Sequence, residues 1–393
     1  MTMTRPSTHI DTRAVHAGEP RPRIGGAVTM PIFQSATFEY GGETSYDDLK
    51  YLRLNNTPSQ TALHDKLAAL EGGESALVTA SGMAAISTAL LTVLAPGGHL
   101  LVQGNLYGGT HAFVVHDFAD FGLSYDFIDA DDPSSWASKL TPRTKAIYVE
   151  SMTNPLLQVA NLSHVAEFAR SHRLVSLIDN TFASPYNFRP IEHGFDLVLH
   201  SATKYLNGHS DIVAGAVVGP RALVQAITHR LNHLGGSLDA HACFLLQRGI
   251  KTLGVRMRQH NESAMRIATW LEGHPAVSRV NYPGLPSHPR HARARDLFGG
   301  FSGVLSFELH GGHEAATRFI TAATIPVIAP SVGGVETLLT LPATTSHVGM
   351  SPTERRHAGI SDGLVRMSVG LEATDDLVAD VEQALTAVVP AGA

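Results

Sequence analysis

The residues best suited to covalent chemistry follow a short apolar run near the middle of the chain. Residues 197–199 are followed by Ser201, Thr203 and Lys204. An apolar run of this kind is typical of a buried strand, whose end delivers the side chains that follow it into a cleft. A lysine there can form a Schiff base with a carbonyl cofactor, and the two hydroxyl groups can bind that cofactor's phosphate. The stretch alone fits a strand end with a solvated lysine equally well.

Three other residues stand at comparable turns. Asp179 ends the apolar run 175–178, and a carboxylate at the tip of a buried strand needs a cationic partner such as a protonated pyridine nitrogen. Tyr107 follows the run 100–103, where an aromatic ring can stack on a planar cofactor. Gly82 opens a helical pattern, whose first N–H groups suit a phosphate. Each also has a structural alternative: a turn cap, loop packing and a sterically required glycine.

Arg366 lies in the alternating run 364–369. Strict alternation predicts a strand with one buried face, so Val365, Met367 and Val369 take the core and Arg366 faces away. A guanidinium on a rigid strand is suited to holding a carboxylate through two hydrogen bonds. The alternative is a solvated arginine at a sheet edge.

The elements that position these residues divide the chain into three predicted parts. Residues 1–56 are rich in proline and glycine and predict an extended arm. Residues 57–250 carry apolar runs without alternation, separated by intervals long enough for helices, which predicts a mostly parallel sheet covered on both faces. Residues 251–393 carry alternating runs and a closing amphipathic helix, which predicts a smaller α+β domain.

Composition excludes several classes of protein. A chain of 393 residues that is 44% hydrophobic and 16% charged is typical of a globular protein. The net charge of −6 argues against a nucleic-acid partner. The polar first residues resemble no signal peptide, the most apolar segment is too short to span a membrane, and the single Cys243 fits a reducing compartment, so we expect a cytoplasmic protein with no membrane partner. The 22 histidines show no metal-ligand spacing, so no metal is expected.

The stretch 201–210, Ser-Ala-Thr-Lys-Tyr-Leu-Asn-Gly-His-Ser, resembles the signature of the trans-sulfuration (Cys/Met metabolism) family of pyridoxal 5′-phosphate (PLP) enzymes. This family includes cystathionine γ-lyase, cystathionine γ-synthase, cystathionine β-lyase, methionine γ-lyase and the O-acylhomoserine sulfhydrylases. The resemblance runs from 12–18 to 364–372, with several motifs in the same order. It implies a type I, aspartate-aminotransferase-like PLP fold, in which 57–250 is the PLP-binding α/β domain and 251–393 the α+β domain.

The resemblance also implies a role for each candidate residue. Lys204 forms the Schiff base and shuttles protons, with Tyr51 and Tyr107 as further catalytic residues. Cofactor binding is assigned to Gly82, Met83, Ser201 and Thr203 at the phosphate, Asp179 at the pyridine nitrogen, Asn154 at the phenolic oxygen, Tyr107 on the ring, and Lys204, Tyr51 and Arg53. Arg366, Ser331 and Asn154 are assigned to the substrate's α-carboxylate. Tyr51 and Arg53 reach into the neighbouring subunit's site from the arm, which implies a homotetramer built as a dimer of dimers.

By the same resemblance, the predicted reaction is γ-elimination on a homocysteine- or homoserine-derived amino acid, of the cystathionine or methionine γ-lyase type, releasing 2-oxobutyrate and ammonia. The alternative is γ-replacement, as in cystathionine γ-synthase or the O-acylhomoserine sulfhydrylases, and both sulfur and oxygen leaving groups stay open.

The sequence departs from the family pattern where substrate choice is decided. Pro330 precedes Ser331 where cystathionine-handling γ-enzymes carry a glutamate, Ala112 stands where some carry an arginine, and Gly109 replaces the cysteine usual in methionine γ-lyases. The segment 55–58 reads Asn-Asn-Thr-Pro where many relatives have Asn-Pro-Thr. We therefore expect a less charged distal pocket that prefers a compact substrate with a neutral γ-substituent.

Overall fold

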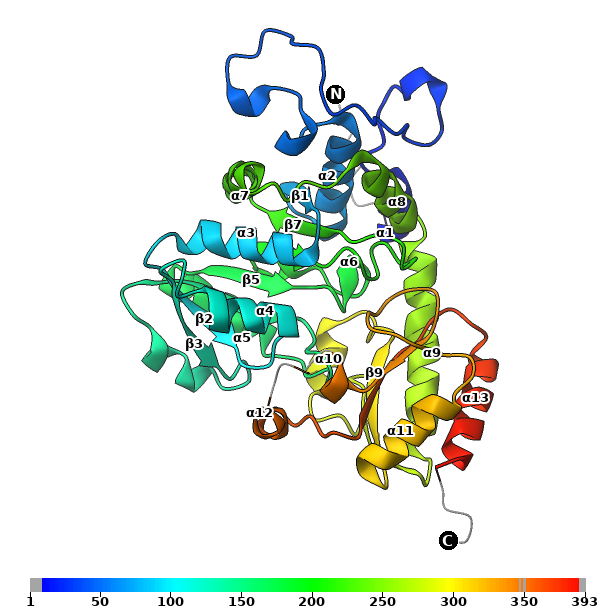
Figure 1. Ribbon diagram of the computed structural model, residues 1–393. Helices are drawn as coiled ribbons and strands as arrows, with labels where there is room; N and C mark the ends of the chain where they lie inside the picture. Colours follow the sequence, from blue (N-terminus) through cyan, green and yellow to red (C-terminus); the bar gives the residue numbers. More distant parts are fainter. Residues whose placement is uncertain (1–8, 346–347, 349–350, 389–393) are drawn as a thin grey trace.

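The structure is a computed structural model that describes residues 9–345, 348 and 351–388. The outer ends of the predicted first and third parts lie outside the described residues. Two sheets organise the described chain, a larger one formed first in the sequence and a smaller one formed after it (Figure 1).

The larger sheet has seven strands within the described residues, in the order β1-β7-β6-β5-β4-β2-β3. Five of them, β3, β2, β4, β5 and β6, run parallel, and β7 is antiparallel to both β6 and β1. The strands are β1 (Ser75–Thr79), β2 (His99–Gln103), β3 (Ser124–Ile128), β4 (Thr144–Glu150), β5 (Val175–Asp179), β6 (Leu197–His200) and β7 (Gly215–Gly219).

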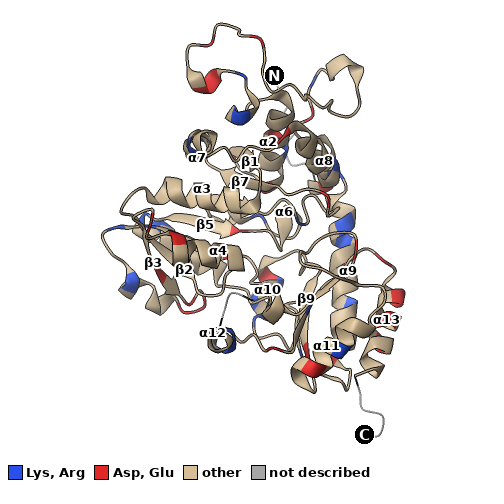
Figure 2. Cartoon of the chain, viewed as in Figure 1, with Lys and Arg blue, Asp and Glu red and all other residues tan. Residues whose placement is uncertain are grey.

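Both faces of this sheet are buried, as the apolar runs predict. Successive side chains of β4 alternate between two cores: Ile147 and Val149 pack with α2, α5 and α8, while Ala146 and Tyr148 pack with α3 and α7. α3 carries no charged side chain (Figure 2), which suits a helix packed closely on the sheet. The helices of this part are α1 (Ile10–His16), α2 (Pro58–Glu71), α3 (Gly82–Leu94), α4 (Gly108–Ala112), α5 (Leu162–His172), α6 (Ser184–Asn187), α7 (Arg221–Leu234) and α8 (Ala240–Ile250).

The smaller sheet has five strands within the described residues, in the order β10-β11-β12-β9-β8. The strands are β8 (Val277–Asn281), β9 (Val304–Leu309), β10 (Val327–Ile328), β11 (Leu338–Thr340) and β12 (Leu364–Ser368). The helices are α9 (Leu253–Glu272), α10 (His291–Leu297), α11 (Gly312–Ala322), α12 (Pro352–His357) and α13 (Thr374–Thr386).

The prediction of one buried face for β12 was wrong. Val365 and Met367 pack in the core against α9, α11 and α13, as expected, but Arg366 on the opposite face is only 5% exposed. That face looks toward the larger sheet's part of the chain, because Arg366 donates a hydrogen bond to Asn154 and Ser306 of β9 donates one to the carbonyl of Pro155. The alternation of apolar and polar residues in a strand indicates which face is apolar, but it does not indicate whether the polar face is also buried.

The predicted boundaries between 56 and 57 and between 250 and 251 stay proposals. The N-terminal half of α9 contributes Leu253 and Met257 to the larger core, and its C-terminal half contributes Ile267 and Leu271 to the smaller one. The arm is extended only in part, since α1 packs near α2, where buried Lys66 donates to the carbonyl of Ala14 at 2.9 Å. Figure 1 shows the following loops standing away from the two sheets, at the top of the view.

None of the helices described is long and apolar enough to cross a membrane.

Candidate active site

A cavity of about 690 Å³ lies at the carboxyl ends of β4, β5 and β6. The structure brings ten of the twelve predicted site residues together in its lining. They are Gly82, Met83, Tyr107, Asn154, Asp179, Ser201, Thr203, Lys204, Ser331 and Arg366. Parallel strands end at the same edge, so residues far apart in sequence meet there.

Lys204 stands in the turn that follows β6, four residues after the strand ends at His200, and lines this cavity. Its Nζ donates a hydrogen bond to Oγ of Ser331 at 2.6 Å. Burial, with the positive charge of Arg366 nearby, lowers the pKa of Lys204 to about 8. A lysine amine with this pKa is partly neutral near neutral pH, as a nucleophile for a carbonyl cofactor must be.

The residues predicted for a phosphate gather around the start of α3. The N–H groups of Gly82 and Met83 have no acceptor among the residues that the structure describes. A side chain at Gly82 would meet Cβ of Ser201 at 2.8 Å, so only glycine permits this close approach. The hydroxyl group of Thr203 is less available to a phosphate, because it donates a hydrogen bond to the carbonyl of Ala214 and accepts one from the N–H of Ala214. Free amides at a helix start, with Ser201 beside them, form a cradle that fits a phosphate.

Asp179 ends β5 with its carboxyl group buried in the cavity wall. Its Oδ1 accepts the N–H of Thr181 at 2.9 Å, and no cation bonds it within the described chain. Burial raises the pKa of Asp179, partly offset by hydrogen bonds from Thr181. A buried carboxyl group that lacks a cationic partner fits the protonated pyridine nitrogen of PLP. Together with the phosphate cradle and Lys204, it makes the cavity a fitting site for that cofactor.

Arg366 is held on the other side of the cavity by neutral partners. Its Nη1 donates to Oδ1 of Asn154 at 3.1 Å and its Nη2 to the carbonyl of Ser331 at 3.0 Å. Burial lowers its pKa to about 10, and its buried Nε has no partner among the described residues. A buried guanidinium without a carboxylate is suited to receive one from a ligand.

Tyr51 and Arg53 do not line this cavity. The guanidinium of Arg53 donates to the carbonyl of Asn232 at 2.7 Å and to the hydroxyl of Tyr46, and it lies 5.5 Å from the ring centre of Tyr51. The two predicted residues therefore lie together at the base of the arm, outside their own chain's cavity.

The unusual segment 55–58 starts a helix and braces Tyr51. Thr57 caps α2 in a reciprocal arrangement with Gln60, and Pro58 takes the first helical position, where its missing N–H costs nothing. Oδ1 of Asn56 accepts the N–H of Tyr51 at 3.1 Å. Asn-Thr-Pro thus fixes the backbone that carries Tyr51.

Sequence reasoning missed Glu150, which ends β4 and lines the cavity beside Asp179. It is 5% exposed, and its Oε1 accepts the N–H of Tyr107 at 2.6 Å. A glutamate at the end of an apolar run usually marks the point where the chain becomes exposed to solvent. The only indication of a site residue in the sequence was therefore the position of Glu150 at the end of a strand.

Ala112 was predicted to form part of the distal wall, and it is not in the described lining of the cavity of Lys204. It lines an adjoining cavity of about 200 Å³ with His111 and Glu354, and Gly108 and Asn154 line both cavities. Pro330 does line the cavity of Lys204.

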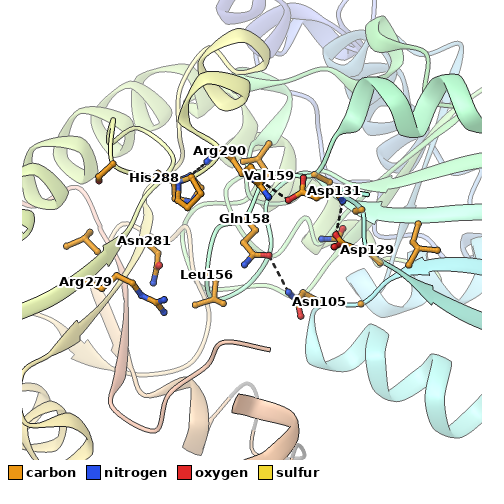
Figure 3. Close-up of a pocket in the computed structure, with 18 of the residues that line it drawn as sticks. Asn105, Asp129, Asp131, Leu156, Gln158, Val159, Arg279, Asn281, His288 and Arg290 are labelled. Carbon is orange, nitrogen blue, oxygen red and sulfur yellow. Dashed lines mark hydrogen bonds and ion pairs between the residues drawn. The ribbon is translucent and has the colours of Figure 1, made fainter. Parts of the chain in front are cut away.

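A larger cavity of about 920 Å³ lies between β8 and the ends of β2 and β3. Figure 3 shows that its polar side chains turn toward one another: Asn105 bonds Gln158, and Arg290 pairs with Asp131. Arg279, also in its lining, pairs with Glu308. The lysine and the predicted site residues lie elsewhere, so we place the chemistry in the cavity of Lys204.

Within the described residues, no three His, Cys, Asp or Glu side chains are grouped so that they could hold a metal ion.

Comparison with known proteins agrees with this geometry. Residues 11–386 match the family model described as "Cys/Met metabolism PLP-dependent enzyme". The chain is 44% identical to an L-methionine gamma-lyase of Pseudomonas putida (96% of this chain, 97% of the relative) and 41% identical to a cystathionine beta-lyase of Coxiella burnetii (96% and 98%). Among solved structures, cystathionine gamma-lyase from Lactobacillus plantarum complexed with L-serine matches with a TM-score of 0.92 and 38% identity, over 97% of this chain and 99% of that one.

Proposed function

The chain belongs to the Cys/Met metabolism family of PLP-dependent enzymes, and from this premise we propose that it is a γ-eliminating C–S lyase for a sulfur amino acid with a compact, uncharged γ-substituent. Membership confirms the predicted family, the type I fold and the PLP cofactor. With methionine as the type substrate, one water is consumed and 2-oxobutyrate, ammonia and a thiol are released.

The observation that carries the proposal is the distribution of charge around the cavity. Apart from tyrosine, the described lining of the cavity contains four ionisable side chains, which are those of Glu150, Asp179, Lys204 and Arg366. Asp179 and Lys204 are assigned to the cofactor, Arg366 to the substrate's α-carboxylate, and Glu150 bonds the backbone of Tyr107. The remaining lining is largely apolar and includes Ile86, Met152, Phe182, Val213, Pro330 and Val332.

This distribution favours methionine over cystathionine. Cystathionine ends in a second ammonium and carboxylate, and burying them without matched partners costs several kcal/mol. A methylthio group needs no such partners and gains from apolar contact. Within the described lining that this chain supplies, no cation other than Lys204 and Arg366 is present and position 330 is a proline and not a glutamate, which supports a compact substrate.

The chain's own residues can orient the substrate and move protons. Arg366, held by Asn154 and Ser331, would bind the α-carboxylate through two hydrogen bonds. Bound at Lys204, PLP supplies an electron sink for the substrate's carbon atoms. The Lys204 amine would be placed to take and return protons at the substrate's carbon chain, since its lowered pKa leaves part of it neutral.

Two other reactions are kept as alternatives for specific reasons. Relatives at 40–41% identity are named cystathionine beta-lyases, which favours β-elimination as a second candidate. The predicted γ-replacement differs from γ-elimination in its last stage, because a nucleophile takes the place of the departed γ-substituent instead of a keto acid being released. The product separates all three: 2-oxobutyrate for γ-elimination, pyruvate for β-elimination, and a new amino acid for γ-replacement.

We also propose that the working unit is at least a dimer, assembled into the predicted homotetramer. Tyr51 and Arg53 lie outside their own cavity, on an arm that exposes Val28 (80%) and Tyr40 (69%). Exposed apolar side chains on a projecting segment support contact with a second copy. By this proposal, Tyr51 and Arg53 complete the partner's site.

The test is a product assay with purified enzyme and PLP, using methionine, cystathionine, homocysteine and an O-acylhomoserine, each with and without added thiol. We expect 2-oxobutyrate from methionine, with kcat/KM at least about tenfold above that for cystathionine. Pyruvate from cystathionine as the main product would establish β-elimination instead. Little keto acid without thiol, and a new thioether with it, would establish γ-replacement.

A further inference from the structure

Glu150 connects three segments around the site. Its own N–H donates to Oε1 of Gln103 at the end of β2, at 3.0 Å. Its Oε1 accepts the N–H of Tyr107, which lies after β2 on the cavity rim, at 2.6 Å. Its register partner on β5 is Asp179. A buried carboxyl group therefore fixes the position of the Tyr107 backbone.

Apart from Glu150, the backbone of Tyr107 has one other hydrogen-bond partner in the described chain, the N–H of His111 in α4, which its carbonyl accepts at 3.0 Å. The side chain of Tyr107 is 45% exposed, and it stands at the start of the five-residue helix α4, before Gly108 and Gly109. Its ring lies against Gly109, where a Cβ would meet Cε1 of the ring at 2.7 Å. Since the ring's position follows its backbone, and the bond from His111 lies within the short helix itself, the hydrogen bond to Glu150 is the one that ties the ring to the sheet.

The charge state of Glu150 follows from its surroundings. Asp179 faces it from β5, and two buried carboxylates on neighbouring strands repel each other. Asp179 accepts the N–H of Thr181, whereas Glu150 accepts only that of Tyr107, and neither Lys204 nor Arg366 donates to Glu150 within the described chain. Burial, together with the charge of Asp179, raises the pKa of Glu150 well above its usual range.

We propose that Glu150 is a positioning residue which, as a neutral carboxyl group, anchors the backbone of Tyr107 and so places its ring over the PLP site, leaving Asp179 as the ionised partner of the cofactor. The inference rests on the role proposed for Tyr107, and it goes beyond the proposed function because it concerns the cofactor site whatever the leaving group is.

The test compares Glu150→Gln with Glu150→Ala. Glutamine keeps an acceptor oxygen and carries no charge, so it imitates a neutral carboxyl group, whereas alanine removes the acceptor. Hydrogen exchange at the amide of Tyr107, measured in the cofactor-free protein, reports on the hydrogen bond itself. Asn105→Ala is the control for general disturbance of this loop, because its side chain contacts Gln158 and not Glu150.

We expect wild-type protection at Tyr107 in Glu150→Gln and Asn105→Ala, and its loss in Glu150→Ala. PLP affinity should stay within about twofold of wild type in Glu150→Gln and fall about tenfold in Glu150→Ala, as expected for one lost hydrogen bond to a buried group. In the holoenzyme, the loss should appear mainly in kcat, because the ring acts on the reacting cofactor and not on the carboxylate clamp.

Two results would overturn the proposal. If Glu150→Gln loses protection and affinity as Glu150→Ala does, the group acts as a carboxylate; if Glu150→Ala keeps both, it anchors nothing. Should Glu150→Ala fail to fold, Glu150→Gln still decides the charge state, and Glu150→Asp, whose shorter side chain withdraws the acceptor, decides the anchor. Failure of the proposed function would appear separately, as a wild-type enzyme with normal protection at Tyr107 but no C–S lyase activity.

Discussion

Lys204 and Ser331 are joined by a 2.6 Å hydrogen bond although 127 positions separate them in the sequence. Ser331 also accepts a hydrogen bond from Arg366 through its carbonyl, and its backbone takes the left-handed conformation, with φ of 96°. The proposed attachment point of the cofactor and the proposed clamp for the substrate thus share one residue, held in a backbone conformation that few side chains adopt. The two functions are therefore linked by geometry.

The first prediction is that Lys204→Ala abolishes turnover and leaves the fold intact. The change removes the covalent attachment point and the proton carrier, and it empties no apolar core position. The variant should be colourless where the wild type is yellow, with an unchanged circular dichroism spectrum. Lys66→Ala is the matched control. It removes another buried amine, one that bonds the carbonyl of Ala14 and pairs with the buried carboxylate of Glu19 at 3.8 Å, so it should cost about 3–5 kcal/mol of stability and spare turnover in the folded fraction. Lys204→Ala with wild-type turnover would contradict this assignment.

The second prediction is that the rate of covalent PLP capture by the cofactor-free protein rises with pH and levels off above about pH 8. Burial and Arg366 lower the pKa of Lys204 to about 8, so the neutral, nucleophilic amine grows about tenfold per pH unit below that value. The same shift makes the folded cofactor-free protein gain stability between about pH 8 and the ordinary lysine value, because only the unfolded chain still binds the proton there. Rapid-mixing absorbance would measure the capture rate.

Arg366→Gln removes the neighbouring positive charge, so the midpoint of this capture profile should move upward. A profile that levels off only near pH 10 in the wild type would show an unperturbed amine at position 204.

The site residues that lie at the ends of strands were predicted from the sequence, because an apolar run followed by a polar residue marks the end of a buried strand. Sequence reasoning missed β3, an edge strand whose one partner in the described chain is β2, because the polar residues of Ser124–Ile128 break the apolar run. It also missed the buried polar face around Arg366 and the burial of Glu150. Arg366 and Glu150 are both buried by segments that are distant in sequence, and a local pattern of apolar and polar residues does not indicate such contacts.

The third prediction concerns the shared site. Lys204→Ala and Arg53→Ala chains should each be inactive alone, and co-expression should restore part of the activity. In a mixed dimer one site receives an intact Lys204 and the partner's intact Arg53, and the other site receives both defects. Purification through two different tags followed by the product assay measures the rescue. Two copies of Arg53→Ala, carrying both tags, are the control. Full activity in a monomer would rule out a shared site.

The fourth prediction is that Pro330→Glu shifts specificity toward cystathionine. A glutamate on the cavity wall supplies a partner for the distal ammonium group, so the ratio of kcat/KM for cystathionine to that for methionine should rise by about tenfold. Pro330→Ala controls for the loss of the proline ring, which frees the backbone before Ser331. An equal shift in both variants would trace the effect to the backbone. A wild-type preference for cystathionine over every compact analogue would refute the argument from Pro330.

The central claim is that Lys204 holds the cofactor in the cavity between the two sheets. Borohydride reduction of the holoenzyme fixes the cofactor to its lysine, and peptide mass spectrometry then locates it. Lys66 is the informative competitor, because burial also lowers its pKa to about 8, yet its amine bonds the carbonyl of Ala14 away from the cavity. The account predicts the reduced cofactor on Lys204 and none on Lys66. Label on any lysine other than Lys204 would contradict it.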